Sequence, residues 1–440
     1  MIKERIVMVC QHSQADLREN LHLSRFSKVN RIRRFFGVTQ LKYKDNAPWI
    51  NAILSHFSDQ TLYEMHVVSP HIGMKKNIEE FELGGVYFHF YKNYPSTSVI
   101  GILGKLFPNY CPTYRINKNR VEQIIDTINP KLILLIGIED PSYSTTILDI
   151  KNIPIFVMSQ TILQDPDFSA HFAVKRYEYL TNLEKSIFNR SGYVGVYTEN
   201  HYKWLKNSGY KGNIFNFTWP EKNAPLATPQ DGITKENDFI NFATRMSDEK
   251  GYPDSIKALA IVKQKYPNVT LNLIDTGSTR EKQELLSLII SLNLEQNVSF
   301  TPFFEKKTDL FQHIQKARFG VLPCKLDFFS GTMIQCMQYG VPITVYKTEG
   351  TPTLNHDANC VLIAELNDIS GLAENMLKLL KDEALAERLK SNSLEYIQKR
   401  HQKNAGSMNR LIDDFSAIID NYYHNAAIPK NLLYKEYPQN

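Results

Sequence analysis

The chain has 440 residues, of which 42% are hydrophobic and 22% are charged, with a formal net charge of +5. This composition is ordinary for a folded globular protein, and the length predicts two or three domains. The mild positive charge gives no argument for a nucleic-acid partner, and no apolar run approaches the roughly 18 residues that a membrane span needs.

Strand and helix patterns alternate through the first half of the chain. The first apolar run, residues 5–10, predicts a buried strand and not a signal peptide. Residues 18–36 interleave basic with apolar side chains. They predict either a basic amphipathic segment that lies on an anionic membrane surface or an ordinary solvated helix or loop with one side toward the core. Further strands are expected at 63–69, 86–91, 131–136, 153–158 and 193–197, and helices at 47–54, 114–128 and 172–188.

The second half of the chain repeats this alternation after a proline-rich segment, 219–232, which predicts a domain boundary. Strands that alternate with helices predict parallel sheets covered on both faces, and ligands collect beyond the carboxyl ends of such strands. The expected strands are 238–243, 270–274, 298–300, 319–322 and 343–345, and the expected helices are 255–265, 368–401 and 404–423.

The stretch 323–342 carries the strongest chemical signal, because a loop there opens onto the start of a helix. The first amides of a helix and its dipole favour a phosphate group, and Ser330 and Gly331 leave room for close approach. Asp327 and Gln335 are suited to hydroxyl groups, so a nucleotide-sugar matches the set. The alternative is an ordinary strand–helix–strand crossover in which Asp327 is a solvated loop residue.

Two further candidates follow other expected strands. Arg245 and Lys250 stand on a loop after 238–243, where two cations would neutralise a pyrophosphate leaving group; the alternative is a pair of surface cations. Gln160 follows strand 153–158 and can hydrogen-bond a sugar hydroxyl, although it cannot act as a general base. Its alternative is an ordinary turn residue. The twelve histidines are dispersed, and we find no cluster with metal-ligand spacing.

The stretch 323–342 resembles the signature of retaining glycosyltransferases of family 4, in the GT-B superfamily. That signature has a Glu, seven residues, and then Glu-Ala-Met-Ala-x-Gly-x-Pro-Val. Here Asp327 stands at the first Glu and Gln335 at the second, whereas the Gly-x-Pro end is intact. The resemblance covers most of the chain and is strongest from 239 to 363. The loop 349–355 resembles a subset of bacterial capsule and surface-polysaccharide transferases.

The resemblance implies a role for each candidate residue. Arg245 and Lys250 match the pair that clamps the donor diphosphate. Asp327 and Gln160 would position the donor sugar, and Gln335 would bind the ribose. The remaining candidates are the turn Ser330, Gly331 and Thr332 on the donor side and Gly37, in a segment that resembles the loop shaping the acceptor cleft.

The implied fold is α/β, with two Rossmann-like, doubly wound parallel-sheet domains of GT-B type that face each other across a cleft. We expect an N-terminal domain of residues 1–220, onto which 405–440 pack back, and a nucleotide-sugar-binding domain of residues 236–404. The five scattered cysteines favour a reduced, cytoplasmic protein without structural zinc. The basic amphipathic pattern of residues 18–36 adds the expectation of peripheral attachment to the inner face of the cytoplasmic membrane.

The implied reaction moves a sugar from a nucleotide-diphosphate donor to an acceptor hydroxyl with retention, without a metal or another cofactor. The acceptor would be a glycan or a lipid-linked saccharide in surface-polysaccharide or glycoconjugate synthesis. The rival hypothesis is a catalytically inactive GT-B scaffold that binds a partner transferase or a glycan. The altered positions 160, 327 and 335 motivate that rival, and the retained Arg245 and Lys250 argue against it.

Overall fold

A computed structural model gives the architecture of the chain as two units. One unit comprises Met1–Lys222 with Asn404–Asn440, and the other comprises Asn223–Lys403. Among the described residues, no helix combines the length and apolar character needed to cross a bilayer. The proline-rich segment 219–232 lies outside the described residues. The structure describes residues 3–35, 43, 45, 47, 50–57, 62–95, 102–103, 106–107, 110–159, 162–164, 174–196, 199–217, 233–243, 245–276, 279–304, 307–325, 330–348, 350–356 and 358–434.

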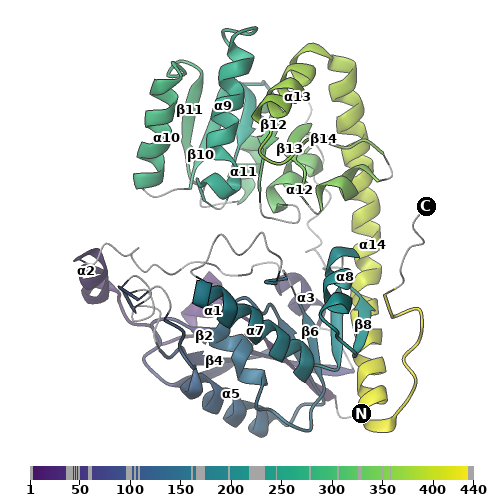
Figure 1. Ribbon diagram of the computed structural model, residues 1–440. Helices are drawn as coiled ribbons and strands as arrows, with labels where there is room; N and C mark the ends of the chain where they lie inside the picture. Colours follow the sequence, from purple (N-terminus) through teal and green to yellow (C-terminus); the bar gives the residue numbers. More distant parts are fainter. Residues whose placement is uncertain are drawn as a thin grey trace. The chain divides into compact units, whose positions relative to one another are not determined.

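The first unit is built on a sheet that has eight strands within the described part of the chain, in the order β3-β4-β2-β1-β5-β6-β7-β8 (Figure 1). The strands are β1 (Glu4–Val9), β2 (Tyr63–His71), β3 (Ile78–Leu83), β4 (Val86–Lys92), β5 (Leu132–Ile136), β6 (Ile155–Met158), β7 (Tyr193–Val196) and β8 (Asn213–Asn216). The helices are α1 (Ala15–Glu19), α2 (Ser27–Phe35), α3 (Ile50–Phe57), α5 (Arg115–Ile128), α6 (Pro141–Ser144), α7 (Val174–Arg190) and α8 (Glu199–Asn207), with a 3-10 turn η1 (Thr145–Ile147).

Both faces of this sheet are buried, because alternate residues of each central strand enter different cores. On β1, Ile6 and Met8 pack in the core that holds Phe415 from the C-terminal helix. Val7 and Val9 point the other way, into the core with α5 and α7. The side-chain period of two in a strand therefore places helices on both sides of the sheet, as the alternation of patterns predicts.

One strand of the first unit departs from the predicted parallel arrangement. β3 pairs with β4 in antiparallel register, Ile78 opposite Tyr91. Gly84 and Gly85 join the two strands with φ angles of 60° and 75°. A two-residue turn of this kind needs positive φ at both positions, which glycine supplies without steric cost. The glycine pair is the hairpin signal in the sequence, and the sequence prediction overlooked it.

The second unit has a sheet of six parallel strands among the residues described, in the order β11-β10-β9-β12-β13-β14 (Figure 1). Numbered along this unit, the order is 3-2-1-4-5-6, so the direction of winding reverses between the neighbours β9 and β12. The strands are β9 (Asn237–Asn241), β10 (Leu271–Asp275), β11 (Val298–Pro302), β12 (Ala317–Leu322), β13 (Ile343–Tyr346) and β14 (Leu362–Ala364). The helices are α9 (Tyr252–Lys263), α10 (Thr279–Ser291), α11 (Lys307–Ile314), α12 (Gly331–Gln338) and α13 (Ile369–Lys381), with 3-10 turns η3 (Asp248–Lys250) and η4 (Thr351–Asn355).

The C-terminal helices differ from the predicted pair, 368–401 and 404–423. The helix breaks at Asp382, and α14 (Glu383–His424) then continues without interruption. The Asp382 carboxylate accepts a hydrogen bond from the Leu385 amide at 2.8 Å and so caps the start of α14. Leu389 of α14 packs in the core of the second unit, whereas Phe415 and Ile418 pack in the core of the first.

Candidate functional site

Two loops meet beyond the carboxyl ends of β9 and β12, where the winding of the sheet reverses. The amide of Lys325 donates to the carbonyl oxygen of Glu249 at 2.9 Å. A Cβ atom on Gly251 would lie 2.2 Å from the carbonyl oxygen of Pro323, so only glycine allows this approach. The turn after β9 and the loop after β12 are therefore in direct contact. This edge of a doubly wound sheet is where ligands bind.

Lys250 is the last residue of η3, and its half-buried side chain points across to the loop after β12. Its Nζ atom lies 3.8 Å from the Sγ atom of Cys324. Arg245 stands earlier on the same turn, with 65% of its side chain exposed, and its guanidinium lies 3.6 Å from a carboxylate oxygen of Glu281. The turn after β9 thus carries two cations, one held against the neighbouring loop and one on the surface.

The loop after β12 leads into α12, whose N-terminus carries three of the predicted residues. Ser330 precedes the helix and makes no capping hydrogen bond with its side chain. Its hydroxyl oxygen lies 2.7 Å from that of Thr332 instead. A Cβ atom on the exposed Gly331 would meet no atom of the described residues within 4 Å. The start of α12 is therefore open to an anionic group, with Gln335 one turn further along the helix.

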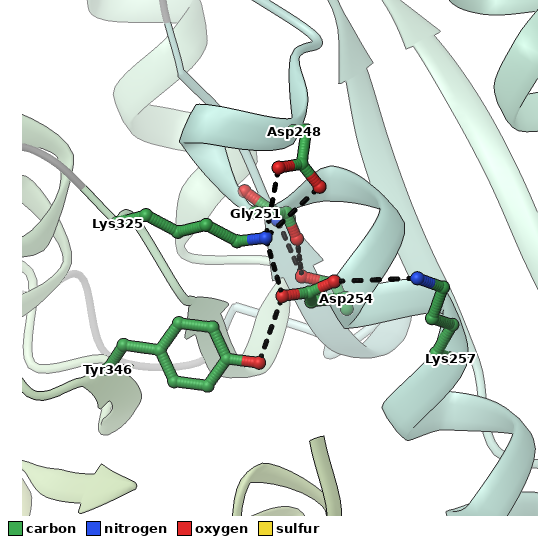
Figure 2. Close-up of polar contacts among 8 residues, drawn as sticks. Asp248, Gly251, Asp254, Lys257, Lys325 and Tyr346 are labelled. Carbon is green, nitrogen blue, oxygen red and sulfur yellow. Dashed lines mark hydrogen bonds and ion pairs between the residues drawn. The ribbon is translucent and has the colours of Figure 1, made fainter. Parts of the chain in front are cut away.

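An ion cluster lies beside these loops (Figure 2). The ammonium group of Lys325 lies 3.0 Å from a carboxylate oxygen of Asp248 and 3.0 Å from one of Asp254. Asp254, in the first turn of α9, is 3% exposed and also accepts a hydrogen bond from the Tyr346 hydroxyl at 3.0 Å. Lys257 lies 3.8 Å from the same carboxylate. The cluster therefore links the turn after β9, the start of α9, the loop after β12 and the end of β13.

The charges of this cluster fix its protonation. Burial lowers the pKa of Lys325, but the hydrogen bonds and charges of Asp254 and Asp248 outweigh it and raise that pKa above its ordinary value. Burial, and after it the charge of Asp254, raises the pKa of Tyr346 far above its ordinary value. Lys325 is therefore a cation, and Tyr346 a neutral donor, throughout the physiological range.

The structure brings some of the predicted residues together. Lys250 contacts the loop after β12, and the same loop leads to Ser330, Gly331, Thr332 and Gln335. Arg245 is on the turn that carries Lys250, but its described contact is with Glu281 on α10. Asp327, Gln160 and Gly37 lie outside the described residues.

Sequence reasoning missed Lys325 and its two carboxylates. The signals were a lysine directly after a buried strand and an aspartate in the first turn of a helix, where negative charge is favoured. The pairing of Lys325 with these aspartates can be inferred only when β9 and β12 are known to be neighbours in the sheet.

Comparisons with known proteins identify the second unit. Residues 226–396 match the family described as glycosyl transferases group 1. An uncharacterized glycosyltransferase of Bacillus subtilis is 24% identical over 190 residues, which are 43% of this chain and 51% of that protein. The chain thus spans about half the length, or less, of the curated relatives that it matches.

Solved structures agree with the fold across nearly the whole chain. Sucrose-phosphate synthase from Thermosynechococcus elongatus has a TM-score of 0.65 at 15% identity, covering 94% of this chain and 100% of that one. The HepE protein of Anabaena, in complex with UDP and glucose, has a TM-score of 0.63 at 16% identity with the same coverage. Residues 226–396 thus match the group 1 glycosyltransferases, and the two α/β units of the chain have the GT-B fold of these solved structures.

Proposed function

We propose that this chain transfers a sugar from a nucleotide-diphosphate donor to an acceptor hydroxyl, with retention of configuration at the sugar. The observation that carries the proposal is the meeting of two anion-binding features at one edge of the second sheet. Lys250 follows β9, and the open start of α12 follows β12, its neighbour. A diphosphate placed at this edge would meet a cation and helix amides together. The UDP held by the HepE structure supports a nucleotide donor.

Each candidate residue has a task in this proposal. Lys250 and Arg245 would neutralise the leaving diphosphate together with the amides at Gly331, so no metal is required for charge neutralisation. Gln335 would bind ribose hydroxyls. Asp327 and Gln160 would position the donor sugar. Turnover would depend most on the four residues proposed as catalytic, Asp327, Gln160, Arg245 and Lys250.

The acceptor side of the proposal lies in the first unit. We propose an acceptor glycan or lipid-linked saccharide of surface-polysaccharide or glycoconjugate synthesis, an assignment that rests on the resemblance of the loop 349–355. Gly37 would help to shape the acceptor cleft. Attachment to the inner face of the cytoplasmic membrane would bring the enzyme to a lipid-linked acceptor, and α2 supports this with exposed apolar and basic side chains.

Replacing Lys250 tests the proposed diphosphate site. A charge-assisted contact contributes about 1.5–3 kcal/mol, so Lys250→Ala should weaken binding of UDP or GDP by about tenfold to a hundredfold. Calorimetry on a panel of nucleoside diphosphates would measure this. Lys263→Ala, at the far end of α9, is the matched control and should keep the wild-type affinity. Equal affinity of the wild type and Lys250→Ala would remove Lys250 from the site.

The same panel separates an enzyme from an inactive scaffold. An enzyme should bind at least one nucleoside diphosphate and slowly hydrolyse or transfer the matching nucleotide-sugar. A wild-type chain that binds none of them and turns over no nucleotide-sugar would favour the scaffold.

A further inference from the structure

Lys325 is the centre of an ion cluster that the proposed transfer does not use directly. Its side chain is 16% exposed and lies between two carboxylates on consecutive elements, both far from Lys325 in the sequence. Asp248 is on η3, with 69% of its side chain exposed, and Asp254 is on α9, with 4% exposed. Figure 2 shows the ammonium group between them, with Tyr346 on the far side of Asp254.

The cluster holds the turn that carries Lys250. Apart from the contact of Lys250 itself with Cys324, that turn is tied to the loop after β12 at three described points. These are the ion pairs of Lys325, the bond from its amide to the Glu249 carbonyl, and the contact of Gly251 with Pro323. Along the loop, Cys324 contacts the ammonium group of Lys250, and the next residue, Lys325, pairs with Asp248 of the same turn. The position of Lys250 thus depends on its neighbours in both loops.

Lys325 also neutralises negative charge near the position proposed for the diphosphate. Asp248 and Asp254 are anions close to the position proposed for a diphosphate, and a diphosphate is itself strongly negative. Without Lys325, the described partners left to the buried carboxylate of Asp254 would be the Tyr346 hydroxyl at 3.0 Å and the Lys257 ammonium at 3.8 Å. A buried charge that loses its close partner draws on the remaining cations and repels nearby anions.

We propose that Lys325 is a positioning residue for donor binding. By pairing with Asp248 and Asp254, it holds the 248–251 turn against the loop after β12. It thereby presents the Lys250 ammonium group to the diphosphate and neutralises the carboxylates behind it. This inference rests on the proposed function, since it assigns Lys325 to the binding of the same nucleoside diphosphate. Lys325 itself does not touch the ligand.

A double-mutant cycle between Lys325 and Lys250 tests the inference. Lys325→Met keeps the length of the side chain and removes its charge. If Lys325 acts through Lys250, Lys325→Met should weaken UDP or GDP binding about tenfold in the wild-type background and less than about twofold in the Lys250→Ala background. Calorimetry measures the affinities, and thermal unfolding of each variant monitors folding.

Two further variants complete the experiment. Asp248→Asn removes the exposed partner and keeps the buried one, so it should fold even if Lys325→Met does not. It should weaken binding by about twofold to fivefold, again only when Lys250 is present. Lys316→Met is the matched control, because Lys316 pairs with Glu236 at 2.9 Å at the amino ends of the same strands, β9 and β12. It should leave the affinity unchanged.

The outcomes separate this inference from the function on which it rests. A wild-type chain that binds no nucleoside diphosphate overturns both. Wild-type binding together with unchanged affinity in Lys325→Met and Asp248→Asn overturns only the role of Lys325. Losses that add in the double variant also overturn it, because they would mean that Lys325 meets the ligand itself or acts through overall folding. A loss that disappears without Lys250 supports the inference.

Discussion

Gly251 lies at a close approach between the two loops of the candidate site. Its φ angle is +74°, and a Cβ atom there would lie 2.2 Å from the Pro323 carbonyl oxygen. Gly251→Ala should therefore lower the free energy of unfolding by about 1–3 kcal/mol, because both backbone strain and the close approach oppose it. Urea unfolding measures the change. Gly331→Ala is the control, since a methyl group there meets nothing within 4 Å in the described part of the chain. Equal stability of the two variants would contradict the close approach.

Single residues also mark the limit of prediction from the sequence. Arg245 and Lys250 were predicted because both stand on one short loop after a recognisable strand. Lys325 and Asp254 were not, because their pairing depends on the adjacency of β9 and β12, which are far apart in the chain. A pattern in the sequence indicates which residues end a strand, but it does not give the order of the strands in the sheet.

The helix α2 (Ser27–Phe35) exposes two large apolar side chains. Phe35 is 85% exposed and Ile32 is 53% exposed. Lys28 and Arg31 are also exposed, whereas Arg33 is buried, and burial lowers its pKa. The predicted basic face is therefore interrupted at Arg33. The exposed side chains nevertheless combine the two features that bind an anionic membrane surface, apolar anchors and cations.

Vesicle binding tests this use of α2. The chain should cosediment with vesicles that contain anionic lipid and be released by salt, because exposed charges are screened. Each basic residue near the surface contributes about 1 kcal/mol, so Lys28→Glu with Arg31→Glu should abolish most of the binding. Ile290→Ser, at an exposed apolar residue of α10, is the control and should bind as the wild type does. Equal binding to neutral vesicles, or none to either, would leave α2 an ordinary solvated helix.

The two α/β units of the whole molecule were predicted from the alternation of strand and helix patterns. A buried apolar run such as β5 (Leu132–Ile136) indicates either an interior strand of a parallel sheet or a buried helix. Because the run is only five residues long, a strand is the better prediction. The edge of the first sheet was not predicted. Three of the six residues of β3 (Ile78–Leu83) are glutamates, so this strand lacks the apolar run by which the other strands were recognised. The continuity of α14 could not be predicted from the sequence either. Its N-terminal part packs in the core of the second unit and its C-terminal part in the core of the first, so its apolar pattern changes along the helix.

Asp414 connects this long helix to the stability of the whole chain. Its side chain is fully buried in the first unit, next to Phe415 in the core. Neither carboxylate oxygen has a hydrogen bond among the described residues, and the Arg410 guanidinium lies 3.5 Å away. Burial raises the pKa of Asp414 from 3.8 to about 7, against the smaller opposing effect of Arg410. The folded chain therefore keeps this proton over a pH range in which the unfolded chain has lost it.

The sign of the resulting pH dependence follows from proton linkage. Between pH 4 and pH 7, about the two pKa values, the folded state binds more protons than the unfolded state, so rising pH lowers the free energy of unfolding. Asp414→Asn removes this term. The variant should gain stability over the wild type as pH rises through this window, and above pH 7 the gain should reach on the order of 4 kcal/mol. Urea unfolding from pH 4 to pH 8 measures the difference, with Asp413→Asn, at the exposed neighbouring aspartate, as the control. A difference between Asp414→Asn and the wild type that stays constant with pH would mean that Asp414 is ionised in the folded chain, and that the ion pair with Arg410 outweighs burial.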